Sequence, residues 1–595
     1  MRHALRCPLL LTFFAASQLA LAAEPPHNVI LFVPDGLRAA IVKPELAPNF
    51  AKLRDEGVNF QNSHSLYPTF TTANASAFAT GHGLGDTGDF ANVIYVGFDA
   101  TTAHGSVTPF LEDDAVLREI NAQKRYEGNY LGRESLLTAA AKKGYMTAVV
   151  GKVGPAAIQA LPALNESRIL LLDDSTGASA GAPIGSEWID ALKTSSVPLQ
   201  APGRGSNGSA ANGALVANYA QQQYFLEATL MDVLPAFKRA GKPFFLVFWS
   251  RDPDGTQHNE GDNVGDPEHG DGINGPTSLE AVRVADVALG AIRQQLQRLK
   301  LDGSTDIIVA ADHGFSTITK TLGSRTLSLG FLALDLTKAL HETDSGITLF
   351  EADASGAEVK WQDHVAPKYG NGRIGHTDAA SADIIVAANG GSDLLYLTNP
   401  KTARTQARAI VAFLLKQDYV DGLFVDDDLG SIPGTVRMSD IGLKGDAKTP
   451  TPSIVVNFKS TPGNCEVPER CAREIADTSN QAGQGMHGSF GRADTWNFAA
   501  AIGPSFKAGY VDKMPMSNAD VGMTVAHLLG LMPSSKGKVP GRVLEESFKD
   551  GREQPFAVRE LASSPSADGT RTVVQQQQVG THRYSDWAVL RRAQP

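Results

Sequence analysis

Three apolar runs, each followed within a few residues by an aspartate, constrain the fold of this chain most. The runs cover residues 29–33, 244–249 and 306–311, the last of which opens with Asp306 before five apolar residues. The acids that follow the runs are Asp35, Asp254 and Asp312. An unbroken apolar run of five or six residues is typical of a strand buried on both faces of a parallel sheet. Because ligands bind at the carboxyl ends of such strands, we expect these acids to meet at one sheet edge.

Segments of helical periodicity alternate with the strands. Residues 279–299 repeat apolar positions at helical spacing directly before the run at 306–311, and residues 145–150 form another apolar run. Alternation of strand and helix predicts an α/β fold with a mostly parallel central sheet flanked by helices. We expect one catalytic domain over residues 23–595, with an inserted cap at about 316–480 and a hairpin-like tail at about 550–595.

The first residues have the pattern of an export signal. Arg2 and Arg6 supply positive charge, residues 9–16 are apolar, and residues 20–22 offer a small-x-small cleavage site. We therefore expect a signal peptide at 1–22, cleavage near Ala22 and Ala23, and a periplasmic or secreted protein. No later apolar run reaches the roughly 18 residues that a membrane span needs.

Two cysteines, Cys465 and Cys471, remain after the predicted cleavage. An oxidising compartment would let them close a short disulfide loop, and two unpaired thiols are the alternative. The formal net charge of -11 at pH 7 argues against a nucleic-acid backbone or an anionic membrane as the main partner. A small anionic substrate is still compatible with this charge, because metal ions can offset it locally.

Six side chains of the kinds that bind transition metals occur in four short segments. They are Asp35, Asp254, His258, Asp312, His313 and His487. Each one alone fits a helix cap or a hydrogen-bonded structural histidine. Together, three carboxylates and three imidazoles divide into two metal sites. The mixture of nitrogen and oxygen ligands favours Zn2+, with manganese or iron as alternatives, over calcium or magnesium.

Thr71 is a candidate nucleophile. It precedes a run of small residues that predicts a tightly packed helix ending at Gly81. One interpretation is an ordinary threonine N-cap. The other is a hydroxyl that a metal ion activates for attack, with the helix amino terminus receiving a phosphoryl group.

The order of these motifs resembles that of the alkaline phosphatase superfamily, and specifically its type I phosphodiesterase/nucleotide pyrophosphatase branch. The similarity covers about 28–315 and 480–535, and its motifs are Asp35-Gly-x-Arg38, Thr71-Thr72-Ala73-Asn74 with Thr80-Gly81, Asp254-x-x-x-His258, Asp312-His313-Gly314 and His487-Gly488. The resemblance implies a zinc bound by Asp254, His258 and His487 and a second zinc bound by Asp35, Asp312 and His313 beside the nucleophile Thr71. It also implies that Asn92 helps to hold the phosphoryl oxygens.

The chain departs from this pattern in two places. The family's Thr-Phe-Pro-Asn is here Thr71-Thr72-Ala73-Asn74, which removes an aromatic residue and a proline and leaves nucleotide specificity open. Because Thr69 and Thr72 are close by, the choice of Thr71 rests on its alignment with Asn74. Lys152 resembles a lysine of sulfatases and monoesterases that contacts anionic oxygens, and a solvated surface lysine is the alternative.

We therefore expect an exported, metal-dependent hydrolase of small-molecule phosphate esters. The resemblance implies a phosphodiesterase or nucleotide pyrophosphatase that works through a phosphothreonine intermediate at a two-zinc site. A phosphate monoesterase that uses Lys152 is the alternative enzyme. A zinc-dependent binding module without catalysis is the alternative outside enzymes. We expect no nucleic-acid binding beyond possible nucleotide substrates.

Overall fold

The computed structural model of the chain describes residues 27–164, 169–203, 212–265, 270–533 and 536–592. The predicted signal peptide at 1–22 lies outside the described residues. Within the described ranges, every helix is too short or too polar to traverse a lipid bilayer.

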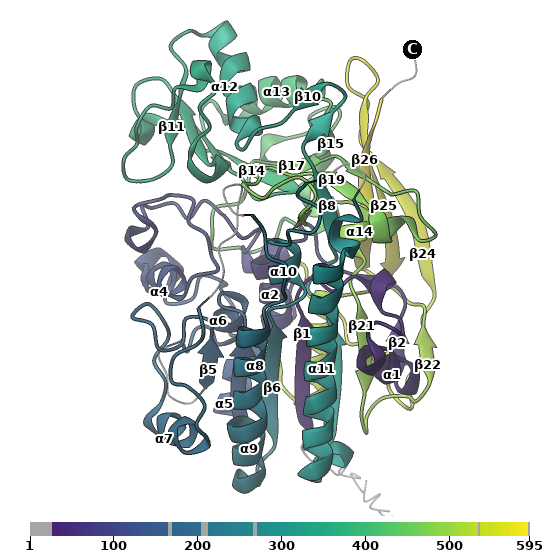
Figure 1. Cartoon of the computed structure of the whole chain (residues 1–595). Coiled ribbons are helices and arrows are strands. Elements are labelled where there is room, and N and C mark those ends of the chain that lie inside the picture. Colours follow the sequence, from purple (N-terminus) through teal and green to yellow (C-terminus); the bar gives the residue numbers. More distant parts are fainter. Residues whose placement is uncertain (1–26, 165–168, 204–211, 266–269, 534–535, 593–595) are drawn as a thin grey trace, which may run out of the picture.

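An eight-stranded sheet forms the centre of the molecule (Figure 1), in the order β22-β2-β21-β7-β1-β6-β4-β5. Its strands are β1 (Asn28–Pro34), β2 (Val58–Phe60), β4 (Met146–Gly151), β5 (Leu170–Asp173), β6 (Phe244–Ser250), β7 (Thr305–Ala310), β21 (Ala499–Ile502) and β22 (Tyr510–Asp512). Neighbouring strands of this sheet are parallel except where β21 pairs with β7 and β2. The predicted α/β class with a mostly parallel sheet is confirmed.

Helices cover both faces of this sheet because its central strands are apolar on both sides. Every residue of β1, β6 and β7 is buried. One face packs against α1 (Pro48–Glu56), α8 (Tyr219–Glu227) and α11 (Pro276–Arg298). The other face packs against α2 (Thr71–Thr80), α5 (Leu136–Lys142), α6 (Pro155–Gln159) and α15 (Asn518–Leu528). The predicted helix at 279–299 is confirmed as α11.

A second, mostly antiparallel sheet lies beyond the central sheet, at the top of Figure 1. It consists of β11 (Thr348–Glu351), β12 (Gly372–Gly375), β13 (Ile384–Ala387), β14 (Ser392–Leu397), β15 (Val420–Val425), β16 (Val436–Arg437) and β17 (Ile454–Phe458). With α12 (Phe331–Thr343) and α13 (Ala403–Leu414), it encloses an apolar core of its own. These elements all lie in the segment expected to be a cap.

The carboxyl-terminal tail forms three antiparallel strands, β24 (Phe556–Ala562), β25 (Arg571–Val579) and β26 (His582–Arg591). The sequence predicted a hairpin, and β24 adds a third strand to it. The tail also bonds to the cap, because Thr572 Oγ1 accepts from the Leu423 amide and Asp421 accepts from the Leu590 amide.

Asp86, in the short helix α3 (Leu84–Thr87), connects three parts of the chain. Its carboxylate accepts hydrogen bonds from His82 and from the amides of Lys538 and Val539, and a further one from the amide of Asp446 in the cap. Burial alone would raise the pKa of Asp86, but these hydrogen bonds outweigh burial and lower the pKa to about 2. The ionised carboxylate therefore stabilises the folded state.

We predict that Asp86→Asn lowers the free energy of unfolding at pH 7 by about 2 kcal/mol, because 1.4 kcal/mol corresponds to each pKa unit. The folded pKa is depressed, so this stabilisation is present above the ordinary pKa of 3.8 and is lost as the pH falls toward 2. Urea unfolding of both proteins between pH 7 and pH 3 should show the difference shrinking. Asp446→Asn, which changes an exposed neighbouring carboxylate, is the matched control and should not show this pH dependence.

Candidate active site

The candidate site lies where several strands of the central sheet end. Asp35 follows β1, and Asp254 begins the short helix α10 (Asp254–Gln257) just after β6. Asp312 and His313 follow β7. His487 comes directly after β20 (Gly485–Met486), which pairs with β8 (Ser316–Thr319).

The structure brings the six candidate ligands together as two groups. Asp35, Asp312 and His313 form the Asp35 group, and Asp254, His258 and His487 form the Asp254 group. Within each group, one ligand atom from each residue lies within 4.8 Å of the others. The groups are adjacent, since His313 Nε2 lies 3.9 Å from Asp254 Oδ1. This is the division that the sequence resemblance implies.

The three imidazoles all present Nε2 to the site. Nδ1 of His258, His313 and His487 lies 2.9, 2.8 and 2.8 Å from the carbonyl oxygens of Gly485, Gly314 and Thr69, respectively. A carbonyl oxygen only accepts, so each Nδ1 carries a proton, and in the neutral imidazole Nε2 is then the nitrogen with the free lone pair. Backbone carbonyls commonly fix metal-binding histidines in this way. The three histidines are therefore oriented as ligands.

Buried atoms of both groups lack hydrogen-bond partners among the described residues. They include Asp35 Oδ1, Asp312 Oδ2 and His487 Nε2. A buried polar atom without a partner costs about 1–3 kcal/mol. A cation bound within each group would compensate these atoms, so the residues present fit two metal ions.

Burial and the crowding of like groups shift the pKa values of residues at the site. Burial, with the nearby carboxylates of Asp254 and Asp312, raises the pKa of Asp35 well above its ordinary value. Burial, with the neighbouring imidazoles of His313 and His258, lowers the pKa of His487 well below its ordinary value. The neutral imidazole is the form that binds a metal, and a bound cation would favour the ionised carboxylates.

Thr71 is the hydroxyl residue that faces the Asp35 group. Its Oγ1 lies 3.1 Å from His313 Nε2 and 3.4 Å from Lys152 Nζ. Thr71 is the first residue of α2, and the N-cap position belongs to Phe70. The interpretation of Thr71 as an ordinary N-cap is therefore wrong, and its hydroxyl is directed at the candidate ligands.

The two neighbouring threonines are engaged elsewhere. Thr69 Oγ1 donates to the carbonyl of Ser489 and accepts from the amide of Gly488. Thr72 Oγ1 is within hydrogen-bond distance of both Asp89 Oδ1 and the Ala91 carbonyl oxygen. Of these three threonines, Thr71 is therefore the one whose hydroxyl faces the candidate ligands.

Asn92 lies beside the start of α2. Its Oδ1 accepts a hydrogen bond of 2.9 Å from the amide of Thr72, and its Nδ2 lies 3.3 Å from Glu112 Oε1. The side chain is therefore next to the candidate nucleophile, where the resemblance expects an asparagine.

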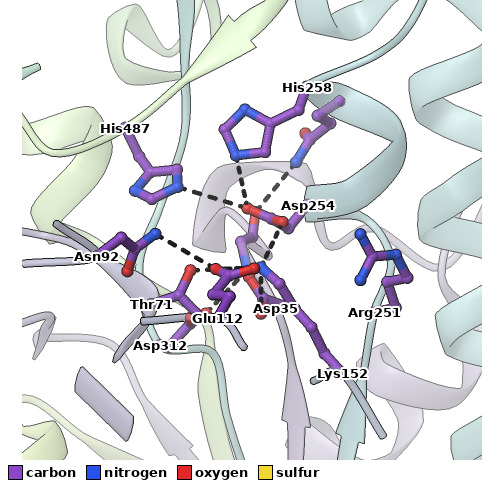
Figure 2. A network of polar contacts seen from close by, with 12 residues as sticks. Asp35, Thr71, Asn92, Glu112, Lys152, Arg251, Asp254, His258, Asp312 and His487 are labelled. Atoms are coloured by element: carbon purple, nitrogen blue, oxygen red, sulfur yellow. Dashed lines mark hydrogen bonds and ion pairs between the residues drawn. The ribbon is translucent and has the colours of Figure 1, made fainter. Parts of the chain in front are cut away.

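Lys152 follows β4 and is 2% exposed. Its Nζ lies 2.8 Å from Asp254 Oδ2, 3.2 Å from Asp35 Oδ2 and 3.2 Å from Glu112 Oε1. Burial would lower the pKa of Lys152, but the three carboxylates outweigh burial and raise it. The alternative of a solvated surface lysine is wrong, and Figure 2 shows the chain extending into the site.

Sequence reasoning missed three residues that support the site. Glu112 contacts both Lys152 and Asn92, Trp249 Nε1 donates to Asp35 Oδ2, and Asn518 Nδ2 donates to the Asp312 carbonyl. None of the three lies in the sequence motifs that carry the family resemblance. Trp249 is the last residue of the apolar run at 244–249, so the pattern predicts only a core residue there and does not mark its indole N–H as a donor to the site.

Comparison with known proteins agrees with this geometry. The model of the family described as "Type I phosphodiesterase / nucleotide pyrophosphatase" matches residues 29–365, which is more than half of the chain. No curated protein matches the chain. The match includes five of the six candidate ligands, Thr71, Asn92 and Lys152, and His487 lies beyond it. This chain belongs to the type I phosphodiesterase/nucleotide pyrophosphatase family of the alkaline phosphatase superfamily and is a phosphoric ester hydrolase of that type.

Proposed function

We propose that the protein hydrolyses phosphodiesters of small molecules by attack of Thr71 on phosphorus. The observation that carries this proposal is the position of Thr71 Oγ1, which lies 3.1 Å from His313 Nε2 beside two groups of potential metal ligands. A hydroxyl at the amino terminus of a ten-residue helix also has the positive end of the helix dipole beside it.

The chemistry takes two steps. Attack forms a bond between Thr71 Oγ1 and phosphorus and breaks the bond from phosphorus to the leaving alcohol, which takes up a proton as Thr71 loses one. The product is a covalent phosphothreonine that still carries the second ester group. Water then attacks phosphorus, restores the Thr71 hydroxyl and releases a phosphate monoester. Lys152 Nζ, 3.4 Å from Thr71 Oγ1, is placed to stabilise negative charge on that oxygen. Asn92 is placed to donate to the phosphoryl oxygens.

The Asp35 group and the Asp254 group would each hold one divalent ion. Mixed nitrogen and oxygen ligands favour zinc, with manganese or iron as alternatives. Ions bound there would supply Lewis acidity for the displacement at phosphorus. The pattern at residues 1–22 and the disulfide between Cys465 and Cys471 support a periplasmic or secreted enzyme.

A phosphate monoesterase is the second candidate function. The position of Lys152 favours it, because a buried ammonium beside Thr71 could bind the additional anionic oxygen of a monoester. Comparing the hydrolysis of bis-p-nitrophenyl phosphate with that of p-nitrophenyl phosphate separates the two functions.

We predict that Thr71→Ala lowers kcat for bis-p-nitrophenyl phosphate by at least about 1,000-fold, because removal of a covalent nucleophile leaves only the surrounding groups to act. Metal content measured by mass spectrometry should stay unchanged. Thr71→Ser keeps a hydroxyl and should retain much of the activity. Rapid-quench digestion of the wild type should locate a p-nitrophenyl phosphate group on residue 71. Wild-type turnover by Thr71→Ala would refute the assignment.

We predict that His258→Ala removes about one of two bound metal ions and lowers activity at least about 100-fold, since even loss of a residue that supports a ligand costs 10- to 100-fold. His376→Ala, which changes an exposed histidine paired with Asp344, should leave the metal content and the activity unchanged. A binding module without catalysis would instead contain metal and show no chelator-sensitive hydrolysis in the wild type.

A further inference from the structure

Glu112 is a buried acid of the site that belongs to neither ligand group. It lies two residues before α4 (Asp114–Ala122) and is 8% exposed. Its Oε1 lies 3.2 Å from Lys152 Nζ and 3.3 Å from Asn92 Nδ2, and Figure 2 shows Asn92 reaching toward it. Glu112 thus contacts the two side chains that the proposed function places around the phosphoryl oxygens.

The backbone fixes Glu112 in this place. Gly154 precedes α6 with φ +89°, and a Cβ there would lie 2.5 Å from the Glu112 Cα. Glycine at 154 is therefore required both by the backbone conformation and by this close approach. Since Lys152 is two residues before Gly154, the same contact holds Glu112 beside Lys152.

Glu112 also orients the Asn92 amide. The Thr72 amide donates to Asn92 Oδ1, and Glu112 Oε1 can only accept, so it requires Nδ2 on its own side. The carboxylate and the amide N–H therefore act together to select one of the two flipped orientations of Asn92. In this orientation the second hydrogen of Nδ2 remains able to donate to a substrate.

The charge of Glu112 bears on the choice of substrate. A phosphodiester has one negative charge at phosphorus, whereas a monoester at alkaline pH has two. Glu112 places a negative charge against Lys152 and Asn92, which are the donors that the additional oxygen of a monoester would use. Repulsion by the Glu112 carboxylate therefore weakens the binding of a dianionic monoester more than that of a monoanionic diester.

We propose that Glu112 is a positioning and specificity-determining residue, which orients Asn92 and Lys152 and makes the site prefer diesters over monoesters. This proposal rests on the proposed function. The preference for diesters comes from the negative charge of Glu112, and the positioning of Asn92 and Lys152 comes from the contacts that its carboxylate makes with them. Two substitutions of Glu112 therefore separate the two effects.

Glu112→Gln removes the charge and keeps an oxygen that can accept from Asn92. We expect the ratio of kcat/KM for bis-p-nitrophenyl phosphate to that for p-nitrophenyl phosphate to fall by about tenfold, as expected for loss of one nearby repulsive charge. Most of the change should be a gain for the monoester. Binding of inorganic phosphate at pH 8, measured by calorimetry, should become about tenfold tighter for the same reason.

Glu112→Ala removes both the charge and the acceptor. We expect kcat for the diester to fall about tenfold with a smaller change in KM, because Asn92 and Lys152 lose their orientation. Glu112→Asp keeps the charge and should keep the wild-type substrate preference. Glu134→Gln, which alters an exposed glutamate paired with Lys142, is the matched control and should match the wild type in every measurement.

The outcomes distinguish this proposal from the proposed function. An inactive wild type, or activity that survives Thr71→Ala, contradicts the proposed function itself. The specificity role is overturned if the wild type depends on Thr71 and Glu112→Gln leaves both the substrate ratio and the affinity for phosphate unchanged. For this comparison, Glu112→Gln must fold and bind its full metal content. A diester kcat in Glu112→Ala equal to that in Glu112→Gln overturns the positioning role.

Discussion

The compensation of buried charge is the constraint on which this structure depends. Three carboxylates of the two ligand groups are buried among three imidazoles, and burial makes an uncompensated carboxylate costly. In the chain itself, the ammonium of Lys152 contacts two of these carboxylates. One ammonium cannot balance three carboxylates, and the three imidazoles direct Nε2, the nitrogen that binds a metal in the neutral ring, at the same site. The cluster is therefore suited to bind cations. Without them, its buried carboxylates lower the stability of the folded state.

The parallel sheet explains why residues far apart in sequence meet here. β1, β6 and β7 are neighbours in register, so the segments that follow them begin at the same sheet edge. His487 needs a different support because it follows a long insertion. The cap supplies that support through a 2.7 Å hydrogen bond from Ser392 Oγ to the Gly488 carbonyl and a 3.0 Å bond from the Gly391 amide to the His487 carbonyl. The cap therefore helps to position the sixth candidate ligand as well as covering the sheet.

The sequence predicted those features that depend on local pattern. Apolar runs identified the central strands, and acids and histidines in short motifs identified six side chains that the structure brings together. Glu112 was missed because its function arises from contacts with residues 20 positions before and 40 positions after it. The burial of Lys152 was left open for the same reason. Charged residues are usually exposed, and only the tertiary fold shows which of them are not.

The small residues of α2 show how packing serves the chemistry. All ten residues of this helix are buried, and it lies against α6 and α15. A Cβ at Gly522 of α15 would come within 2.8 Å of the carbonyl oxygens of Ala77 and Phe78, so the two helix backbones approach closely. Asn518 of α15 bonds to both Asn74 of α2 and the carbonyl of Asp312. The helix that carries Thr71 is thus joined to the segment that carries Asp312 and His313, which keeps the hydroxyl beside the imidazole without a flexible loop between them.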